Sequence, residues 1–379
     1  MSPPKHTQSE SVMRHMEEIA PQGMGTAMAH VQIYDASPTG PTRSLAPVRL
    51  WLLAVAALVY LMLSVGGATR LTGSGLSITE WQPIIGTLPP LSEADWQGAF
   101  AKYQQIPQYQ RVNRGMSLDA FKFIFWWEWA HRLLGRLLGL VFFVPLVYFL
   151  AAGQIARGLL AQLACLLLLG GLQGAIGWYM VRSGLTGRID VSQYRLALHL
   201  GLAMAIFGAL ISVALSLDEP RKVGMERRVA AGSAALIVGL VFLQIVLGAL
   251  VAGLKAGLSH NTWPLMDGRL VPDGLGAMQP WYLNLFENAM TVQFNHRLVA
   301  YVLLAATLWH AWRVRINSPE AVIKGTALAL LAAALAQAGL GIWTLLAHVP
   351  LLLGLAHQAG AAALFAIAVW HLHLLRYVR

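Results

Sequence analysis

The chain has 379 residues, of which 57% are hydrophobic and only 12% are Asp, Glu, Lys or Arg. Soluble proteins carry about 25% of these charged residues, so a chain with a mean hydropathy of +0.57 cannot cover a soluble surface of this size. The apolar residues fall in runs of about 20, the length that crosses a hydrocarbon core about 30 Å thick. The composition excludes a soluble enzyme, a disordered tail and a secreted disulfide scaffold, and it predicts an all-α polytopic membrane protein.

The charge and cysteine content exclude further classes. The formal net charge is +10, but the basic residues are spread along the chain, so no nucleic-acid binding is predicted. Cys165 is the single cysteine, which rules out an intrachain disulfide and a thiolate metal cluster. Residues 1–45 are polar, contain acids and lack an apolar core, unlike a signal or transit peptide. They are predicted to form a flexible cytoplasmic leader of a bacterial protein.

Eight apolar stretches are predicted to span the membrane. They cover residues 50–69, 123–151, 158–181, 196–217, 229–254, 294–312, 325–347 and 350–375. Lys and Arg are denser in the short connections than in the long ones, which predicts both termini on the cytoplasmic side of a bacterial inner membrane. The long connections, 70–122 and 255–293, then lie outside and could cap a site there.

The chain repeats itself at half its length. The segment GGATRLTGSGLSITEWQP, from Gly66, matches GALVAGLKAGLSHNTWP, from Gly248, at an offset of 182. His131 matches His296 at an offset of 165, and two further matches follow in the same order. These are Gln173 with Gln337, offset 164, and His199 with His357, offset 158. Matches in a constant order predict two pseudo-symmetric four-helix bundles, residues 46–220 and 221–379, with the same orientation.

Each predicted bundle offers one histidine from its second helix and one from its fourth. The pairs are His131 with His199 and His296 with His357. Polar side chains in a membrane usually face the interior of a bundle, and two imidazoles from facing helices are a usual axial pair for a low-spin heme. A single histidine could equally make a plain hydrogen bond between helices. The repetition of the pair favours heme.

Glu128 is the one acid that lies well inside an apolar stretch. It precedes His131 by three residues, so both lie on one helical face, and its counterpart in the second half is Gln293. An exchangeable proton beside a metal centre favours catalysis in the N-terminal half, and storage or relay of electrons in the C-terminal half. The alternative is that Glu128 only neutralises Arg132 at i+4. A weaker interpretation is that Arg132, Arg136 and Arg297 face heme propionates.

Several motifs together resemble the heme A synthase family. They are TRLTGSGLSITEWQPIIGTLPPL, FKFIFWWEWAHRLLGR, QGAIGWYMVRSGL, RLALHL, NTWPLMDG, VQFNHRL and LGLAHQ, between about Gly66 and Ala362. The resemblance implies oxidation of the C8 methyl of heme O to a formyl group, which gives heme A for terminal oxidases. We expect two successive oxidations, first to an alcohol and then to a gem-diol that loses water.

The same resemblance implies a division of labour between the histidines. His296 and His357 would ligate a permanent heme b, while His131 and His199 would flank the iron of the substrate heme O, with Glu128 as the essential acid. Some bacterial members carry a cysteine pair in the first outer loop. This chain has none, so it is closer to the mitochondrial-like class. Because an iron with two histidine ligands cannot bind O₂, either one histidine is released or the chemistry occurs at the porphyrin edge.

The implied partners are heme O and its synthase, an electron donor, terminal oxidase assembly and the lipid bilayer. O₂ or water would supply the formyl oxygen, and association of several copies of the chain is left open. The alternative function is a transmembrane b-type cytochrome, because His310 and His371 follow His296 and His357 by 14 residues each. That spacing puts each pair on one face about 21 Å apart, as in a two-heme electron wire. A transporter fits less well, since a single buried acid beside a histidine pair favours redox chemistry.

Overall fold

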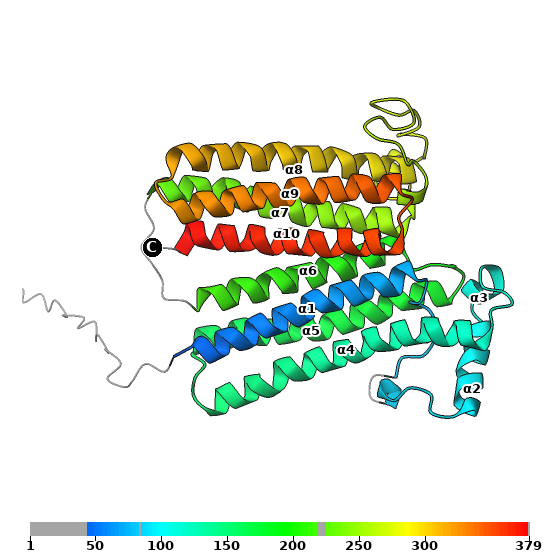
Figure 1. The fold of residues 1–379 in the computed structure, drawn as a ribbon. Helices are drawn as coiled ribbons and strands as arrows, with labels where there is room; N and C mark the ends of the chain where they lie inside the picture. The colour runs from blue at the N-terminus through cyan, green and yellow to red at the C-terminus, as the bar shows by residue number, and fades with distance from the viewer. Residues whose placement is uncertain (1–43, 83–84, 218–224, 378–379) are drawn as a thin grey trace, which may run out of the picture. The chain divides into compact units, whose positions relative to one another are not determined.

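The computed structural model describes residues 44–82, 85–217 and 225–377, and every regular element within them is a helix. The all-helical prediction is therefore confirmed. The long helices are α1 (Ala46–Leu71), α4 (Leu118–Ala151), α5 (Arg157–Leu185), α6 (Gln193–Ser216), α7 (Met225–Gly253), α8 (Ala289–Asn317), α9 (Ala321–Leu346) and α10 (Leu351–Tyr377) (Figure 1). The predicted leader, 1–45, lies almost wholly outside the described residues, as does the predicted boundary between 220 and 221.

Seven helices within the described residues are long and apolar enough to cross a membrane. They are α1, α4, α5, α6, α9 and the parts of α7 and α10 over 230–253 and 351–376. The predicted stretch 294–312 does form a helix, α8, but this helix is not among the seven. Its first turns carry Gln293, Asn295, His296 and Arg297, and its last turns carry two more arginines, so its mean hydropathy is lower. The chain is a multi-pass membrane protein.

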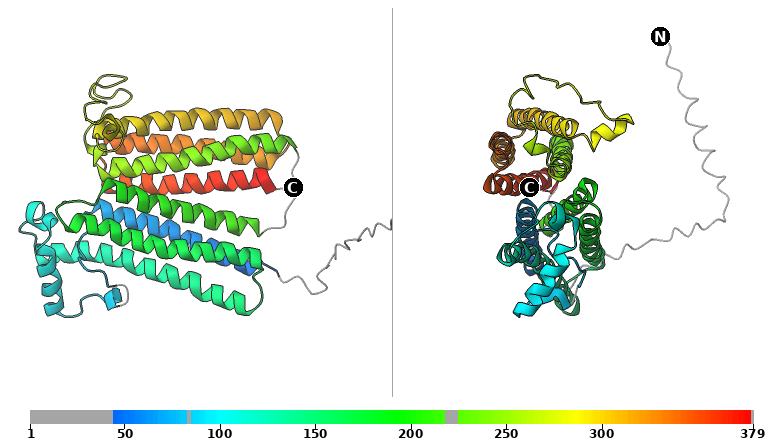
Figure 2. Two further views of the ribbon diagram at one scale, coloured as in Figure 1. Left: turned by 180° about the vertical axis from the view of Figure 1, so that it is seen from behind. Right: turned by 90° about the vertical axis from the view of Figure 1, so that its right-hand side faces the viewer.

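The long helices pack as two groups of four. In the N-terminal helix group, α1 and α5 each contact both α4 and α6. In the C-terminal helix group, α7 and α9 each contact both α8 and α10. Thus α4 lies diagonally across from α6, and α8 across from α10 (Figure 2). The groups meet where α1 and α6 contact α10 and where α6 contacts α7.

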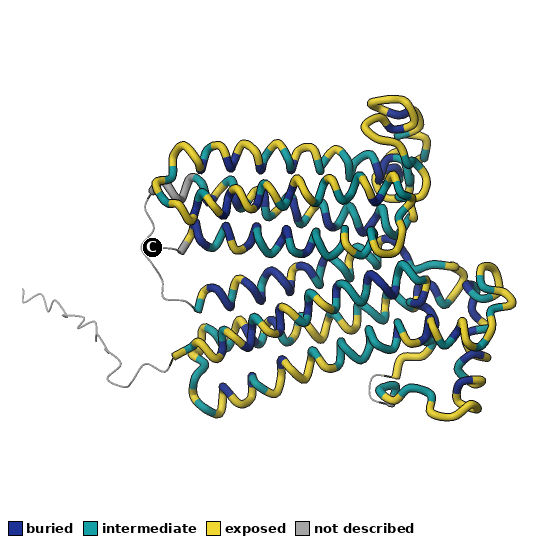
Figure 3. Tube along the Cα trace, in the orientation of Figure 1, coloured by how far each residue is buried: buried dark blue, intermediate teal, exposed yellow. Residues whose placement is uncertain are grey.

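The main apolar core lies between the two groups. Leu52 of α1, Leu210 of α6, Ile237 of α7 and Phe365 of α10 are all almost fully buried and belong to one cluster. The outward faces of the helices are exposed instead (Figure 3), and large apolar side chains such as Leu168 project from them. Exposed apolar faces are what a lipid-facing surface requires, because lipid tails are as apolar as leucine.

The two long connections lie at the same end of the helices (Figure 1). The first contains η1 (Ile85–Thr87), α2 (Glu93–Gln104) and α3 (Pro107–Arg111), and the second contains η2 (Ala256–Leu258) and η3 (Trp281–Leu285). An aromatic cluster around Tyr103 joins the first connection to the start of α4. Burial raises the pKa of Tyr103, whose hydroxyl donates to Gln108 Oε1 at 3.0 Å.

Polar caps fix the starts of the two helices that follow these connections. Ser117 Oγ accepts a hydrogen bond from Ala120 N at 3.2 Å at the start of α4. Asn288 Oδ1 accepts one from Met290 N at 3.1 Å at the start of α8. Each cap satisfies an otherwise unpaired N–H at the helix end. The caps thereby set where α4 and α8, which carry His131 and His296, begin.

Gly208 of α6 lies where the two groups pack closely against each other. A Cβ built there would lie 2.8 Å from Cε1 of Phe365, whereas no atom lies within 4 Å of a Cβ built on Gly239 of α7. Gly208→Ala should destabilise the purified protein by about 1–3 kcal/mol through overpacking. Gly239→Ala, the control, should be neutral or slightly stabilising because alanine has the higher helix propensity. Thermal unfolding in detergent measures both, and equal melting temperatures would contradict the prediction.

Candidate functional site

The first histidine pair stands on diagonal helices of the N-terminal group, His131 on α4 and His199 on α6. Each ring rests against a glycine of a neighbouring helix. A Cβ built on Gly66 of α1 would lie 2.8 Å from Cε1 of His131, and one on Gly177 of α5 would lie 2.9 Å from Cε1 of His199. No larger residue leaves room for either ring in its present position.

The C-terminal group repeats this arrangement at the positions predicted by the sequence alignment. His296 stands on α8 and His357 on the diagonal helix α10. A Cβ built on Gly248 of α7 would lie 3.2 Å from Cε1 of His296, and one on Gly341 of α9 would lie 2.7 Å from Cε1 of His357. At this level each helix group holds one pair of imidazoles, and each of the four rings occupies space that a glycine leaves open.

Three of the four rings are each held by a glutamine, which lies one turn before the contacting glycine on the same helix. Gln173 Nε2 lies 3.1 Å from Nδ1 of His199, and Gln337 Nε2 lies 3.0 Å from Nδ1 of His357. Gln244 Nε2 lies 3.2 Å from Nε2 of His296. Each of the three amides also donates to the carbonyl oxygen of the same histidine, at 2.7–3.0 Å. These paired contacts fix the ring on its helix.

His131 has no such glutamine. The residue four positions before Gly66 is Met62, and its Cε lies 3.3 Å from a Cβ built on Gly135, one turn beyond His131. Nδ1 of His131 is buried without a hydrogen-bond partner. Nδ1 of His296 is also buried and unpartnered. Since buried polar atoms are normally satisfied, these two nitrogens point to a ligand that binds between the histidines of each pair.

Glu128 is buried, with an exposed fraction of 2%. Its Oε2 accepts from Ser77 Oγ and from Ile78 N, both at 2.8 Å. Its Oε1 accepts from Arg132 NH2 at 2.6 Å. Arg132 also donates to the carbonyls of Ile78 and Glu80 at 2.7 and 2.9 Å. Glu128 and Arg132 together therefore fasten the start of the first connection to α4.

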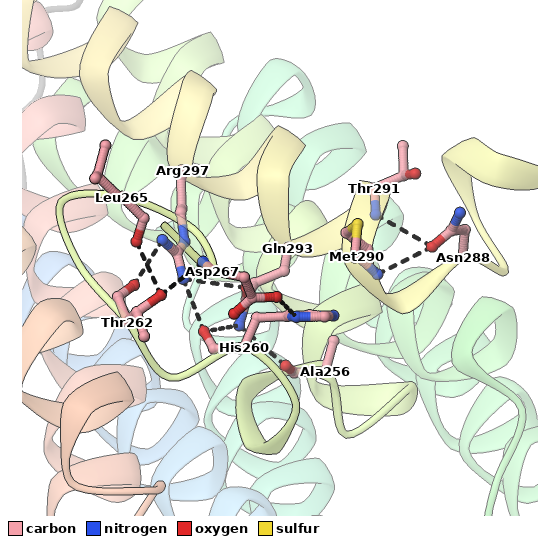
Figure 4. Close-up of polar contacts among 10 residues, drawn as sticks. All are labelled: Ala256, His260, Thr262, Leu265, Asp267, Asn288, Met290, Thr291, Gln293 and Arg297. Atoms are coloured by element: carbon pink, nitrogen blue, oxygen red, sulfur yellow. Dashed lines mark hydrogen bonds and ion pairs between the residues drawn. The ribbon is translucent and has the colours of Figure 1, made fainter. Parts of the chain in front are cut away.

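Gln293 and Arg297 make the corresponding fastening in the C-terminal group (Figure 4). Arg297 NH2 donates to Gln293 Oε1 at 3.1 Å and to His260 O at 2.8 Å, and its NH1 donates to Thr262 O at 2.8 Å. Gln293 Nε2 donates to Ala256 O at 3.0 Å. The two fastenings differ in polarity: the first connection presents donors to a carboxylate, and the second presents carbonyls to an amide.

These contacts bear on two interpretations of the sequence. Arg132 and Arg297 donate to loop carbonyls, and Arg136 NH2 donates to Gln82 O at 3.0 Å. Arg297 Nε is buried without a hydrogen-bond partner, and the weaker interpretation of these arginines as propionate ligands stays a prediction. Charge pairing between Glu128 and Arg132 is present. The hydrogen bonds of the Glu128 carboxylate go to the connection and to Arg132, one turn from His131.

The second predicted histidine level of the C-terminal group is arranged differently. His310 Nε2 lies 2.8 Å from His371 Nε2, and both side chains are fully buried. Ser233 Oγ lies 2.7 Å from Nδ1 of His310, and Thr326 Oγ1 lies 2.8 Å from Nδ1 of His371. All four ring nitrogens thus have protein partners. This pair offers no free nitrogen to an iron in this arrangement.

The donor set at both sites suits a heme. Among the described residues, no group of three or more His, Cys, Asp or Glu side chains could hold a metal ion. Two imidazoles on diagonal helices are instead the axial pair that a porphyrin iron takes, because the porphyrin supplies the other four ligands. The sequence signal that could have identified the supporting residues is Gln-x-x-x-Gly. Within the apolar stretches it occurs at Gln173, Gln244 and Gln337, and outside them it also occurs at Gln82 and Gln154.

Comparison with known proteins agrees with this site. Residues 49–369 match the model of the COX15-CtaA family, described as cytochrome oxidase assembly protein. A protein of Parvibaculum lavamentivorans named heme A synthase is 56% identical over 325 residues, which cover 86% of this chain and 93% of that protein. Heme A synthase of Azorhizobium caulinodans is 56% identical over 331 residues, 87% of this chain and 94% of its own.

A more distant relative is the heme A synthase of Nitrosomonas eutropha, which is 49% identical over 333 residues, 87% of this chain and 94% of its own. The matched region contains all four histidines, the four glycines that contact them and Glu128. The chain therefore belongs to the COX15-CtaA family of cytochrome oxidase assembly proteins.

Proposed function

We propose that this protein is a heme A synthase, an oxidoreductase that converts the C8 methyl of heme O into the formyl group of heme A. The observation that carries the proposal is the duplicated pair of glycine-seated histidines, with a buried acid beside only one pair. Two similar heme sites with different proton chemistry suit an enzyme that has one permanent cofactor and one heme as substrate. Relatives that share about half of the sequence over most of its length carry this name.

All eight long helices, α8 included, cross a bacterial inner membrane in this proposal, as two four-helix bundles with both termini in the cytoplasm. Two of the polar residues that lower the hydropathy of α8, Gln293 and His310, are buried among the other helices. A helix whose polar groups are satisfied by neighbouring helices can cross the membrane at little cost. The connections between α1 and α4 and between α7 and α8 then lie outside, next to the histidine pairs.

His296 and His357 hold a permanent heme b, and His131 and His199 flank the iron of the substrate heme O. Heme iron supplies the oxidising chemistry at an unactivated methyl group, which no protein side chain can perform. The chain seats the rings on its glycines, excludes water and orients the imidazoles through Gln173, Gln244 and Gln337. Glu128 lies one turn from His131 and holds or releases a proton at its carboxylate. O₂ together with an electron donor completes the reaction; where water supplies the formyl oxygen instead, an electron acceptor takes up the four electrons of the oxidation.

Heme O synthase supplies the substrate in this proposal, and assembly of a terminal oxidase consumes the product. The alternative function, a transmembrane b-type cytochrome for electron transfer, needs a second heme level at His310 and His371. Their ring nitrogens contact each other, Ser233 and Thr326, which supports the synthase over the two-heme wire.

Pigment analysis tests the proposed function. Cells that lack their own enzyme, make heme O and express this chain should accumulate heme A, identified by mass after extraction. Cells that carry the empty vector should contain heme O only. Unchanged heme O in cells where the chain is present in the membrane would refute the synthase.

Substitution of the histidines should separate the two sites. His296→Ala or His357→Ala should remove the permanent heme b, because one imidazole alone holds a low-spin iron poorly. His131→Ala or His199→Ala should keep that heme and abolish heme A formation. Heme content by pyridine hemochrome, with pigment analysis beside it, measures both effects. Equal loss of the same heme in all four variants would contradict the division of labour.

Glu128→Gln tests the proton role against charge pairing alone. Heme A formation should fall by about 100-fold or more, the usual contribution of a positioned acid or base. The variant should keep heme b, because Gln293 already occupies the equivalent position beside Arg297. Ile78 N loses its acceptor, at a cost of about 1–3 kcal/mol.

Two matched variants serve as controls for this experiment. Gln293→Glu sets a carboxylate against the carbonyl oxygens of Ala256 and His260. It should therefore loosen the other fastening, while heme A formation should persist in proportion to the heme b that the variant retains. Arg132→Met removes the charge partner while it keeps the carboxylate. Near wild-type product from Glu128→Gln, with heme b retained, would leave Glu128 with the fastening role only.

A further inference from the structure

A hollow with three arginines lies at the end of the His199 site. It encloses about 530 Å³ at the ends of α5 and α6, and it is lined by Arg182, Arg188 and Arg195 together with hydroxyl-bearing side chains. No carboxylate belongs to this lining. Three cations around one hollow repel each other unless an anion enters, so the hollow favours an anionic ligand.

Two of the arginines are held in place with donors to spare. Arg195 stacks on the ring of Tyr179, with its Cζ 3.7 Å from the ring centroid, and its NH1 donates to the Tyr179 carbonyl at 2.6 Å. Arg188 NH2 donates to Gln193 Oε1 at 3.2 Å. A guanidinium has five donors in a planar fork that matches a carboxylate. Each of these side chains can therefore bind a carboxylate without leaving its place.

The hollow is next to the substrate site along both helices. Arg195 lies one turn before His199 on α6, and Tyr179 lies two residues after Gly177, which contacts the His199 ring. A ligand whose iron is at His199 would thus present its edge to the three arginines.

The C-terminal group carries no arginine at the two positions that can be aligned. At the offsets of 164 and 158 that align the glutamines and the histidines, Leu346 and Leu353 stand in place of Arg182 and Arg195. The connection there runs only over 347–350, against 186–192 in the N-terminal group. Arg182 and Arg195 therefore accompany the proposed substrate site and have no arginine counterpart at the proposed permanent heme.

We propose that Arg182, Arg188 and Arg195 bind the propionate carboxylates of the substrate porphyrin. This inference rests on the proposed function, because it assigns the anion to a heme at His131 and His199. Bidentate Arg–carboxylate pairs give both affinity and orientation, so the hollow sets which edge of the porphyrin faces outward and which methyl group faces the reactive side.

Binding of heme O and of its dimethyl ester to the purified full-length protein tests this proposal. The ester keeps the iron and the ring but carries no carboxylate charge. The wild-type protein should bind heme O about tenfold or more tightly than the ester. The double variant Arg182→Gln/Arg188→Gln should lose that preference, through weaker binding of heme O alone. Arg315→Gln, an exposed arginine at the far end of α8, is the control and should keep the preference.

Three results would overturn the proposal. They are no preference in the wild-type protein, equal weakening of both ligands in the double variant, and loss of a copurifying anionic phospholipid from that variant with heme O affinity unchanged. The last result would assign the hollow to a lipid phosphate. Failure of the synthase proposal is distinguishable, because the wild-type protein would then form no heme A in cells that make heme O, whatever its preference between heme O and the ester.

A second inference rests on Met62, independently of the arginines. His199, His296 and His357 are each held by a glutamine, while the same position beside His131 has a thioether that donates no hydrogen bond. The geometry points to His131 as the ligand that turns away from the substrate iron, with His199 as the ligand that stays. Met62 is then a positioning residue that acts through His131, and the inference again rests on the proposed function.

Carbon monoxide binding to the ferrous protein loaded with heme O tests this second inference, because carbon monoxide needs a vacated axial position. Met62→Gln should slow carbon monoxide binding at the substrate site about tenfold or more, because the glutamine supplies the missing hydrogen bond to His131. Met62→Leu, which adds no donor, should react like the wild-type protein. Gln173→Met should cause no large acceleration of carbon monoxide binding, because His131 remains the ligand that leaves faster. An unchanged rate in Met62→Gln, or a large acceleration confined to Gln173→Met, would overturn the assignment to His131.

Discussion

The contact between a glycine on one helix and an imidazole ring on the next is the constraint on which the two sites depend. An imidazole is costly to bury in an apolar helix group, and each of these four rings lies against a position of a neighbouring helix that has no side chain. That space is provided by Gly66, Gly177, Gly248 and Gly341: a Cβ built on any of them would lie only 2.7–3.2 Å from Cε1 of the neighbouring ring. The helix spacing and the direction of each histidine are therefore set by the same four residues.

Duplication followed by divergence explains how one arrangement serves two chemical purposes. Both halves share the glycine-seated histidines and the arginine fastening of the outer connection. They differ beside the proposed substrate heme: Glu128 stands where the C-terminal half has Gln293, Met62 stands where it has Gln244, and Arg182 and Arg195 stand where it has Leu346 and Leu353.

The sequence predicted the all-helical fold, the order of the repeat and the two histidine pairs, because helical spacing and hydropathy are local properties. It did not predict contacts that depend on helix register. The donors of Arg132 go to loop carbonyls, which no motif announces, and the 14-residue spacing of His310 gave its helical face but not its direct bond to His371. The predicted span 294–312 forms α8, which is less apolar than the other predicted spans because it buries polar residues that lower its hydropathy. The repeat aligned Gln173 with Gln337, but it did not predict that these glutamines contact the histidine rings. Met62 stands at the fourth position and breaks the pattern.

The central claim is that each helix group binds one heme and that only the C-terminal heme is permanent. Iron and heme counted per purified chain, before and after addition of heme O and again after removal by excess apomyoglobin, test it most directly. The account predicts one heme b per chain at first, two hemes after loading, and one heme b again after competition. Two hemes that resist competition equally, or none in the purified protein, would contradict it.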